Sequence, residues 1–180
     1  MKFLETKLKG LFEIESTKLE DERGWFMRTF SDDLFKAAIP NFDSKWVQMN
    51  HSYSKQKGTW RGFHYQCPPF QESKLVRCTA GSVIDVALDM RKGSETFLDF
   101  FQLELSAANK KMLFIPKGFA HGFYTLSENV EMLYLHDEYY NPDYEKGINF
   151  KDSMLNFSLP LPIENVSDRD KNFEFLDSTF

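Results

Sequence analysis

The segment Trp60–Gln66 carries one histidine among aromatic residues, and an imidazole in such a place can take a proton from a substrate. Side chains alternate along a β-strand, so His64 would share a face with Gly62 and Gln66 and point into the interior of a barrel. Arg61 would then lie on the opposite face. Two interpretations are open: His64 is the base of a proton-transfer reaction, or it is a core histidine hydrogen-bonded to a backbone carbonyl.

His121 follows a Pro-x-Gly turn in the segment Ile115–Phe123, at a spacing typical of the second half of a cupin motif. In metal-binding cupins this histidine joins two others and a carboxylate, because imidazole and oxygen ligands suit a divalent cation. Here the earlier strand offers His64-x-Gln66 in place of a His-x-His pair. The four histidines of the chain are His51, His64, His121 and His136. A three-histidine site would need ligands from outside the motif, and we expect no catalytic metal.

The segment Ser82–Asp89 would place Asp85 and Asp89 on the face opposite its larger aliphatic side chains. An ionised carboxylate inside a barrel needs a partner. An inward Asp85 therefore predicts a polar pocket in place of a filled hydrophobic centre. An outward Asp85 would simply be solvated.

Strands must hold these candidates in place, and short alternating runs dominate the chain. We expect strands at Leu75–Cys78, Ser82–Asp89, Phe97–Leu105, Lys111–Ile115, Gly122–Leu126 and Val130–His136. Turn residues such as Gly81 and Pro116 separate the runs. Their even spacing is typical of a closed sandwich or barrel.

One helix is expected at Ser31–Ala38, where Ser31 can cap the first turn and Asp32 and Asp33 complement the positive end of the helix dipole. The tail beyond Pro160 should form a loop or a short helix that packs over the barrel. No internal repeat or Gly/Ser linker divides the sequence. We therefore expect one domain over residues 1–180.

The net charge of −5 argues against a general nucleic-acid binder, which needs surplus Lys and Arg to neutralise phosphates. A small anionic ligand would need a local basic cluster in a cleft. Cys67 and Cys78 form no CxxC pattern, so both should be reduced thiols. No window approaches the roughly 20 apolar residues of a membrane-spanning helix, and the N-terminus has no long apolar run. We expect a cytoplasmic protein that contacts no membrane.

Seven short motifs occur in order between Asp21 and Asp170, and together they resemble the dTDP-4-dehydrorhamnose 3,5-epimerase family. They are Asp21-x-Arg23-Gly24-x-Phe26, Gln48-x-Asn50, Arg61-Gly62-x-His64-Tyr65-Gln66, Lys74-Leu75-Val76-Arg77, Asp85-Val86-x-x-Asp89-x-Arg91-x-Gly93-Ser94, Pro116-x-Gly118-Phe119-Ala120-His121-Gly122-Phe123 and Ser167-x-x-Asp170. Each motif is weak alone, but the ordered set is specific. The resemblance implies an all-β fold, a jelly-roll cupin barrel with a few short helices, and a homodimer.

The resemblance also implies four catalytic roles. His64 would be the general base, and Asp170 would orient it. Tyr134 would be the proton donor, and Lys74 would be the cation near the ketone oxygen. A proton beside a ketone is far less acidic than an imidazolium, so a positive group must stabilise the resulting enolate. Inversion further requires a base and an acid on opposite sides of the sugar ring. The Asp170 carboxylate would fix the tautomer of His64. No cofactor is needed for this chemistry.

Contacts to the nucleotide and diphosphate are implied for Arg23, Gln48, Asn50, Arg61, His121 and Glu145. Arginine suits such a role because its guanidinium recognises phosphate with two hydrogen bonds. Arg61 would serve the same site as His64 only if Gly62 marks a bulge, or if Arg61 reaches the pocket of a partner subunit.

Two further candidate contacts depart from the family pattern. Arg28 stands where the family usually has Glu, and Arg169 stands where it has Lys just before the catalytic Asp. The reversed charge at Arg28 puts the usual thymidine nucleotide in doubt, so both dTDP and GDP, for example on a 4-keto heptose, are open.

The expected function is that of an isomerase that epimerises a nucleotide-linked 4-keto sugar at C3, C5 or both, in deoxy-sugar or surface-polysaccharide synthesis. A nucleotide-sugar 3,4-ketoisomerase of the same fold is an alternative, because it uses related enolisation. A metal-dependent cupin oxygenase or a noncatalytic sugar-binding cupin is another.

Overall fold

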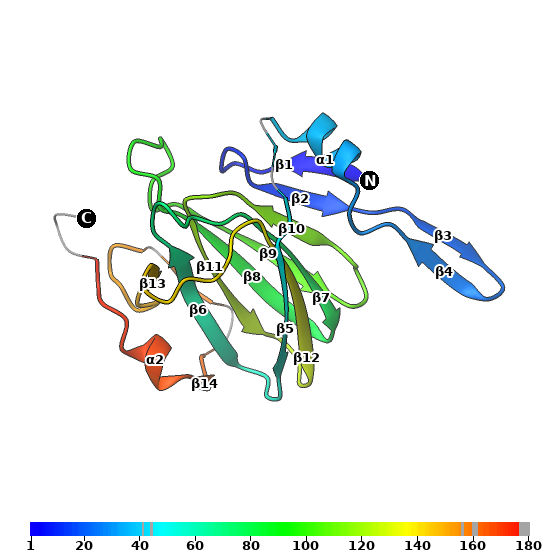
Figure 1. Ribbon diagram of the computed structural model, residues 1–180. Coiled ribbons are helices and arrows are strands. Elements are labelled where there is room, and N and C mark those ends of the chain that lie inside the picture. The colour runs from blue at the N-terminus through cyan, green and yellow to red at the C-terminus, as the bar shows by residue number, and fades with distance from the viewer. Residues whose placement is uncertain (41, 44, 156, 160–161, 177–180) are drawn as a thin grey trace.

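Two facing antiparallel sheets make up the body of the protein (Figure 1). The computed structural model describes residues 1–40, 42–43, 45–155, 157–159 and 162–176. Within these residues the first sheet has the strand order β1 (Lys2–Glu5), β2 (Phe12–Glu15), β10 (Met112–Ile115), β7 (Lys74–Ala80), β12 (Val130–His136) and β5 (Gln48–Ser54). The second has the order β13 (Glu145–Gly147), β6 (Thr59–Gln66), β11 (Phe119–Thr125), β8 (Ser82–Asp89) and β9 (Phe100–Ser106), with β14 (Asn165–Val166) parallel to β6.

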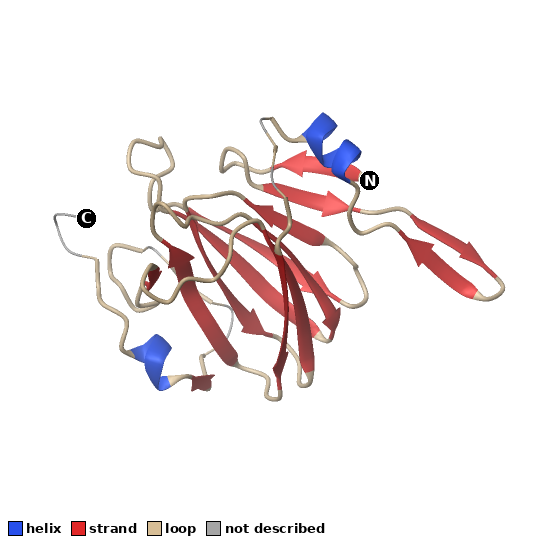
Figure 2. Cartoon of the chain, in the orientation of Figure 1, coloured by secondary structure: helices blue, strands red, loops and turns tan. Residues whose placement is uncertain are grey.

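The helices are short and lie at the periphery, as the cartoon in Figure 2 shows. They are α1 (Asp32–Ala38) and α2 (Asp168–Lys171). The expected all-β jelly-roll cupin barrel with a few short helices is thus confirmed. No helix in the described part of the chain is long and apolar enough to cross a membrane.

Alternation along the strands divides the apolar residues between the interior and the outer faces of the sheets. On β10, Leu113 and Ile115 join the cluster between the sheets, whereas Met112 and Phe114 pack outside, in a cluster with α1. The outer face of the second sheet is covered by residues of the C-terminal segment, which pack on Trp60 and Phe63. Each large side chain that is fully buried in this way stabilises the fold by about 1.5–3 kcal/mol.

Most predicted elements occur close to their expected bounds. Ser82–Asp89 and Val130–His136 are strands from end to end, and the C-terminal tail forms the short helix α2. The strand expected from Phe97 begins only at β9, because the residues before it form a turn. Ser31 precedes α1 as expected, but its hydroxyl makes no capping bond and contacts the Asp33 carboxylate instead.

On β6, the register against β11 shifts by one residue between Arg61 and His64. Both side chains therefore face the interior, while Phe63 packs on the outer face. Gly62 permits this shift because its φ is 137° and a Cβ there would come within 2.5 Å of the Gly122 Cα. Strict alternation, which would separate Arg61 from His64, is wrong for this strand, and Gly62 marks a bulge.

The hairpin of β3 (Lys18–Asp21) and β4 (Gly24–Met27) projects from the body as an arm (Figure 1). Leu19, Trp25 and Phe26 on this arm are 66%, 50% and 65% exposed. Large apolar side chains gathered in the open mark a surface for contact with another molecule.

Candidate active site

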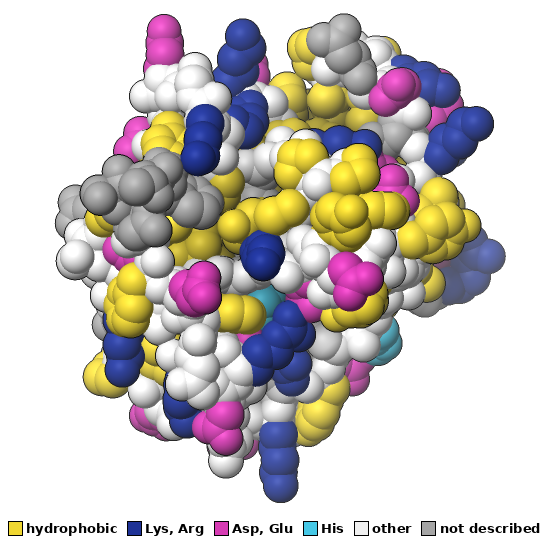
Figure 3. All heavy atoms as spheres, turned by 60° about the vertical axis from the view of Figure 1, so that its left-hand side comes forward, with side chains coloured by type: hydrophobic (Ala, Val, Ile, Leu, Met, Phe, Trp, Pro, Cys, Tyr) yellow, Lys and Arg dark blue, Asp and Glu magenta, His cyan; other side chains and the backbone are white. Residues whose placement is uncertain are grey.

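A cavity of about 260 Å³ opens between the two sheets. Its walls come from the first sheet through Gln48, Asn50, Ser52, Lys74, Tyr134 and His136, and from the second through Arg61, His64, Tyr65, Gln66, His121, Phe123 and Glu145, with Glu72 and Tyr140 from loops. On the face drawn in Figure 3, histidine is visible near the centre, between basic and acidic side chains. Three of the four catalytic candidates, His64, Lys74 and Tyr134, therefore line one polar pocket.

His64 and Asp170 form a pair at the edge of this pocket. The His64 Nε2 lies 2.9 Å from Asp170 Oδ1, and the other carboxylate oxygen accepts the Gly62 backbone N–H at 3.1 Å. Ser167 caps α2 by accepting the Asp170 N–H, which fixes the start of the helix that carries the carboxylate. Burial raises the pKa of the Asp170 carboxyl, but the interactions with His64, Gly62 and Ser167 together outweigh burial and hold the pKa below its ordinary value.

His121 makes a second histidine–carboxylate pair on the same sheet. Its Nε2 lies 3.0 and 2.9 Å from the two carboxylate oxygens of Asp85, and both residues are buried. Asp85 therefore points inward, and the polar pocket that this orientation predicts is present. Sequence reasoning named Asp85 as a polar-pocket residue but did not connect it with His121.

Tyr134 faces these histidines from the first sheet. Its hydroxyl lies 2.8 Å from the Ser52 hydroxyl, and its ring lies 6.2 Å from the His121 ring. Burial raises the pKa of the Tyr134 hydroxyl well above its ordinary value, although the hydrogen bond with Ser52 acts in the opposite direction. The phenol is thus held protonated at neutral pH, as a proton donor must be.

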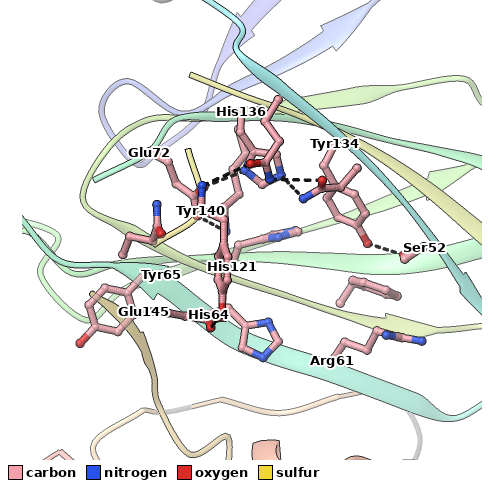
Figure 4. A pocket seen from close by; sticks show the side chains of 15 residues that line it. Ser52, Arg61, His64, Tyr65, Glu72, His121, Tyr134, His136, Tyr140 and Glu145 are labelled. Atoms are coloured by element: carbon pink, nitrogen blue, oxygen red, sulfur yellow. Dashed lines mark hydrogen bonds and ion pairs between the residues drawn. The ribbon is translucent and has the colours of Figure 1, made fainter. Parts of the chain in front are cut away.

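Lys74 lies on the same wall as Tyr134 and is almost fully buried. Its Nζ lies 3.1 Å from Glu72 Oε1, and Glu72 Oε2 lies 2.7 Å from the Nδ1 of His136. Burial raises the pKa of the Glu72 carboxyl, but the charge of Lys74 and the hydrogen bond from His136 outweigh it and lower the pKa to about 2. Figure 4 shows Glu72, His136 and Tyr134 around one side of the pocket, with His64 and Arg61 on the other.

Five of the predicted binding residues line the pocket, namely Gln48, Asn50, Arg61, His121 and Glu145. The Arg61 guanidinium is held by the Ser54 hydroxyl at 3.0 Å and the Tyr53 carbonyl at 2.9 Å.

The other three predicted binding residues, all arginines, do not line it. Arg23 is on the arm and bonds Asp21, and Arg28 is exposed just beyond the arm. Arg169 forms an ion pair with the Glu145 carboxylate at the rim. Within one chain, neither Arg23 nor Arg28 lines the pocket.

Seven pocket residues were not singled out as site residues from sequence: Ser52, Tyr65, Gln66, Glu72, Phe123, His136 and Tyr140. His136 occurs at alternating spacing from Tyr134 on a correctly predicted strand, and this spacing is the signal that would have found it. Glu72 lies in a loop, where no periodicity indicates direction. Among the described residues, no group of three or more His, Cys, Asp or Glu is placed to hold a metal ion.

Comparison with known proteins identifies the family. Residues 5–178 match the model of dTDP-4-dehydrorhamnose 3,5-epimerase. A protein of that name from Shigella flexneri is 40% identical over 181 residues, which cover 100% of this chain and 99% of that protein. The crystal structure of the Elizabethkingia anophelis dTDP-4-dehydrorhamnose 3,5-epimerase superposes with a TM-score of 0.93 at 39% identity, covering 97% of this chain and 96% of that one.

A Legionella pneumophila dTDP-6-deoxy-D-glucose-3,5-epimerase, solved in complex with dTDP-4-keto-L-rhamnose, superposes with a TM-score of 0.90 at 38% identity and covers 97% of this chain and 92% of that one. These matches span nearly the whole chain and agree with the pocket described above. The chain belongs to the dTDP-4-dehydrorhamnose 3,5-epimerase family.

Proposed function

We propose that this protein epimerises a dTDP-linked 4-keto-6-deoxy sugar at C3, C5 or both, through an enolate. The observation that carries the proposal is the placement of the catalytic groups on facing sheets. His64 comes from one sheet, and Tyr134 and Lys74 come from the other. A sugar ring between them would have a base on one side and a proton donor on the other, which is what inversion at carbon requires.

His64 is the general base in this mechanism. Because the Asp170 carboxylate is ionised, His64 Nε2 carries the hydrogen of their 2.9 Å bond, which leaves Nδ1 free to accept a proton. The C–H bond beside the ketone breaks, its proton passes to His64, and its electron pair forms the enolate. The Asp170 carboxylate stabilises the imidazolium that results.

Lys74 stabilises the negative charge that develops on the ketone oxygen, and Tyr134 returns a proton to the carbon from the opposite side. An ammonium has three N–H donors, and Glu72 takes one of them. The Tyr134 hydroxyl gives its proton to the carbon and becomes a phenolate. Afterwards His64 releases its proton to solvent and Tyr134 takes one from solvent, which restores both groups. The same set of groups can act at C3 or C5, since both carbons adjoin the ketone.

The dTDP nucleotide is favoured over GDP for two reasons. The similar Legionella protein is described in complex with a dTDP-linked keto sugar. In addition, Glu145 offsets the charge of Arg169 at the rim, and Arg28 lies outside the pocket of its own chain. The charges of Arg28 and Arg169 therefore do not by themselves argue for a nucleotide other than dTDP.

A homodimer is part of the proposal, because a second copy would cover the exposed apolar side chains of the β3–β4 arm. Arg23 lies on the same arm, so a dimer would give it a route to a pocket that it does not reach within its own chain. Light scattering of the purified protein should give twice the mass of the single chain. A monomeric mass would contradict this part of the proposal.

The test of the activity is proton NMR of dTDP-4-keto-6-deoxyglucose incubated with the enzyme in deuterated water. We expect deuterium at C3, C5 or both together with inverted product, and slower turnover of the GDP-linked sugar as the matched control. Movement of the ketone to C3 without inversion would indicate a ketoisomerase instead. Absence of deuterium from every 4-keto sugar tested would refute the proposal.

A further inference from the structure

Glu72 and His136 belong to a hydrogen-bonded chain whose orientation can be read from one end to the other. The chain begins at the backbone N–H of Tyr140, which donates to Gln48 Oε1 at 3.2 Å. A backbone amide can only donate, so the Gln48 side-chain amide must present its oxygen here. Its NH₂ group then faces Asn50 and donates to the Asn50 Oδ1 at 3.2 Å.

The same reasoning fixes the tautomer of His136. With the Asn50 oxygen occupied, the Asn50 NH₂ group is the part that faces His136 Nε2, at 3.3 Å. That ring nitrogen must therefore accept, and the hydrogen of the neutral imidazole sits on Nδ1. From Nδ1 it donates to Glu72 Oε2 at 2.7 Å, which leaves Oε1 for the Lys74 ammonium at 3.1 Å.

The end of this chain at Lys74 is buried, so its contacts matter more than they would on the surface. The side chains of Lys74, Glu72 and His136 are 8%, 11% and 9% exposed. A buried ammonium without a partner loses its charge or its position. The ring of Tyr134 lies 6.3 Å from the ring of His136 on the same strand. Within the described residues, the carboxylate that pairs with Lys74 is Glu72.

We infer that Glu72, held by the Nδ1–H tautomer of His136, is a positioning residue that keeps the Lys74 ammonium aimed into the pocket as the counter-charge of the enolate. Oε2 of Glu72 accepts from His136 and Oε1 pairs with Lys74, so both carboxylate oxygens hold the ammonium in place. The inference rests on the proposed epimerase function, because it assigns the position of a group that this reaction uses.

The decisive experiment compares Glu72→Gln with wild type for kcat and KM on the dTDP-linked keto sugar. Glutamine keeps the shape but removes the charge, and we expect kcat to fall about 10- to 100-fold, as misplacement of a catalytic group does, with KM within about threefold. The matched control is Glu13→Gln on β2, outside the pocket, which removes the charge that pairs with Lys111 at 2.5 Å. It should leave both constants unchanged.

His136→Phe gives an independent measurement because it removes the bond to Glu72 and leaves the Lys74–Glu72 pair in place. We expect kcat to fall about 5- to 10-fold, the scale of one ordinary hydrogen bond, because His136 acts on Lys74 only through Glu72. The double variant should be no slower than Glu72→Gln alone, since the two residues act as one unit. If Glu72→Gln does not fold, the kcat of His136→Phe tests the inference instead: a lowered kcat supports it, and a wild-type kcat overturns it.

The tautomer is measured without substrate, from the ¹⁵N NMR shifts of the His136 ring. The Nδ1–H form supports the inference, and the Nε2–H form overturns it. A Glu72→Gln variant with wild-type kcat, or with its whole defect in KM, also overturns it. If the wild-type enzyme does not turn over any keto sugar, the proposed function fails, and the tautomer then decides whether the positioning network exists.

Discussion

The two walls of the pocket hold their polar groups in different ways. On the wall of β6, β8 and β11, each of two histidines meets a carboxylate directly, as in the His64–Asp170 and His121–Asp85 pairs. On the wall of β5, β7 and β12, one carboxylate, Glu72, is shared between the Lys74 ammonium and a histidine, and the phenol of Tyr134 meets the Ser52 hydroxyl. In the proposed mechanism, the first wall accepts a proton and stabilises the resulting charge. The second wall donates a proton and offsets negative charge on the substrate.

Loss of the base should have the largest effect. His64→Asn removes the group that takes the proton, and we expect kcat to fall on the order of 10³-fold, since general bases contribute about 10²- to 10⁴-fold. Deuterium exchange into the sugar, followed by NMR, should be lost in the same proportion. The same substitution at His51, which is exposed on the outer face of β5 and bonds Glu131, is the control. If His64→Asn exchanged deuterium at the wild-type rate, His64 would not be the general base.

The stability of the folded protein should depend on pH through Glu72, which lies on the second wall. Its folded-state pKa is about 2, against an ordinary value of 4.5, so its contribution to stability is complete above about pH 4.5 and is lost as the pH falls toward 2. Over that range the free energy of unfolding should decline by on the order of 3 kcal/mol more in wild type than in Glu72→Gln. Urea denaturation between about pH 5 and 3 samples the steep part. Equal slopes for the two proteins would contradict the buried pairing.

Loss of the acid should separate exchange from inversion. Tyr134→Phe removes the proton donor but leaves His64 in place, so deuterium should still enter the sugar while formation of the inverted product falls about 100-fold. Tyr53→Phe, on the outer side of β5 with its hydroxyl bonded to Asn129, is the control. If both exchange and inversion fell together, Tyr134 would be needed for the first step, and the division of labour between the walls would be incorrect.

The sequence predicted the first wall better than the second. Alternation allowed His64 to point inward and left Asp85 open between an inward and an outward position, and the spacing of His121 after its turn matched a cupin motif. The bulge at Gly62 was needed only to bring Arg61 to the same side. The partner of His64 is over a hundred residues away along the chain, and Asp170 came from family resemblance because no local pattern links the two.

The supports of the second wall were missed for physical reasons. β5 is a polar strand, so its hydrophobic pattern is weak, and Ser52 is an unremarkable residue within it. Glu72 precedes β7 in a loop, where side-chain direction depends on tertiary contacts and not on periodicity. The direction of the β3–β4 arm could not be predicted for the same reason. It depends on tertiary contacts, so the sequence of residues 18–27 does not indicate that Arg23 lies away from the pocket of its own chain.

Ser52 offers the finest test of the second wall. Its hydroxyl bonds the Tyr134 hydroxyl at 2.8 Å and lowers the pKa of that phenol, so Ser52→Ala should raise the pKa further and make Tyr134 a weaker acid. We expect inversion to slow by about 3- to 10-fold, the scale of one hydrogen bond, with exchange unaffected. In the Tyr134→Phe background the same substitution should have no further effect, because the bond is already absent. An equal loss in both backgrounds would mean that Ser52 acts on the substrate directly and not through the phenol.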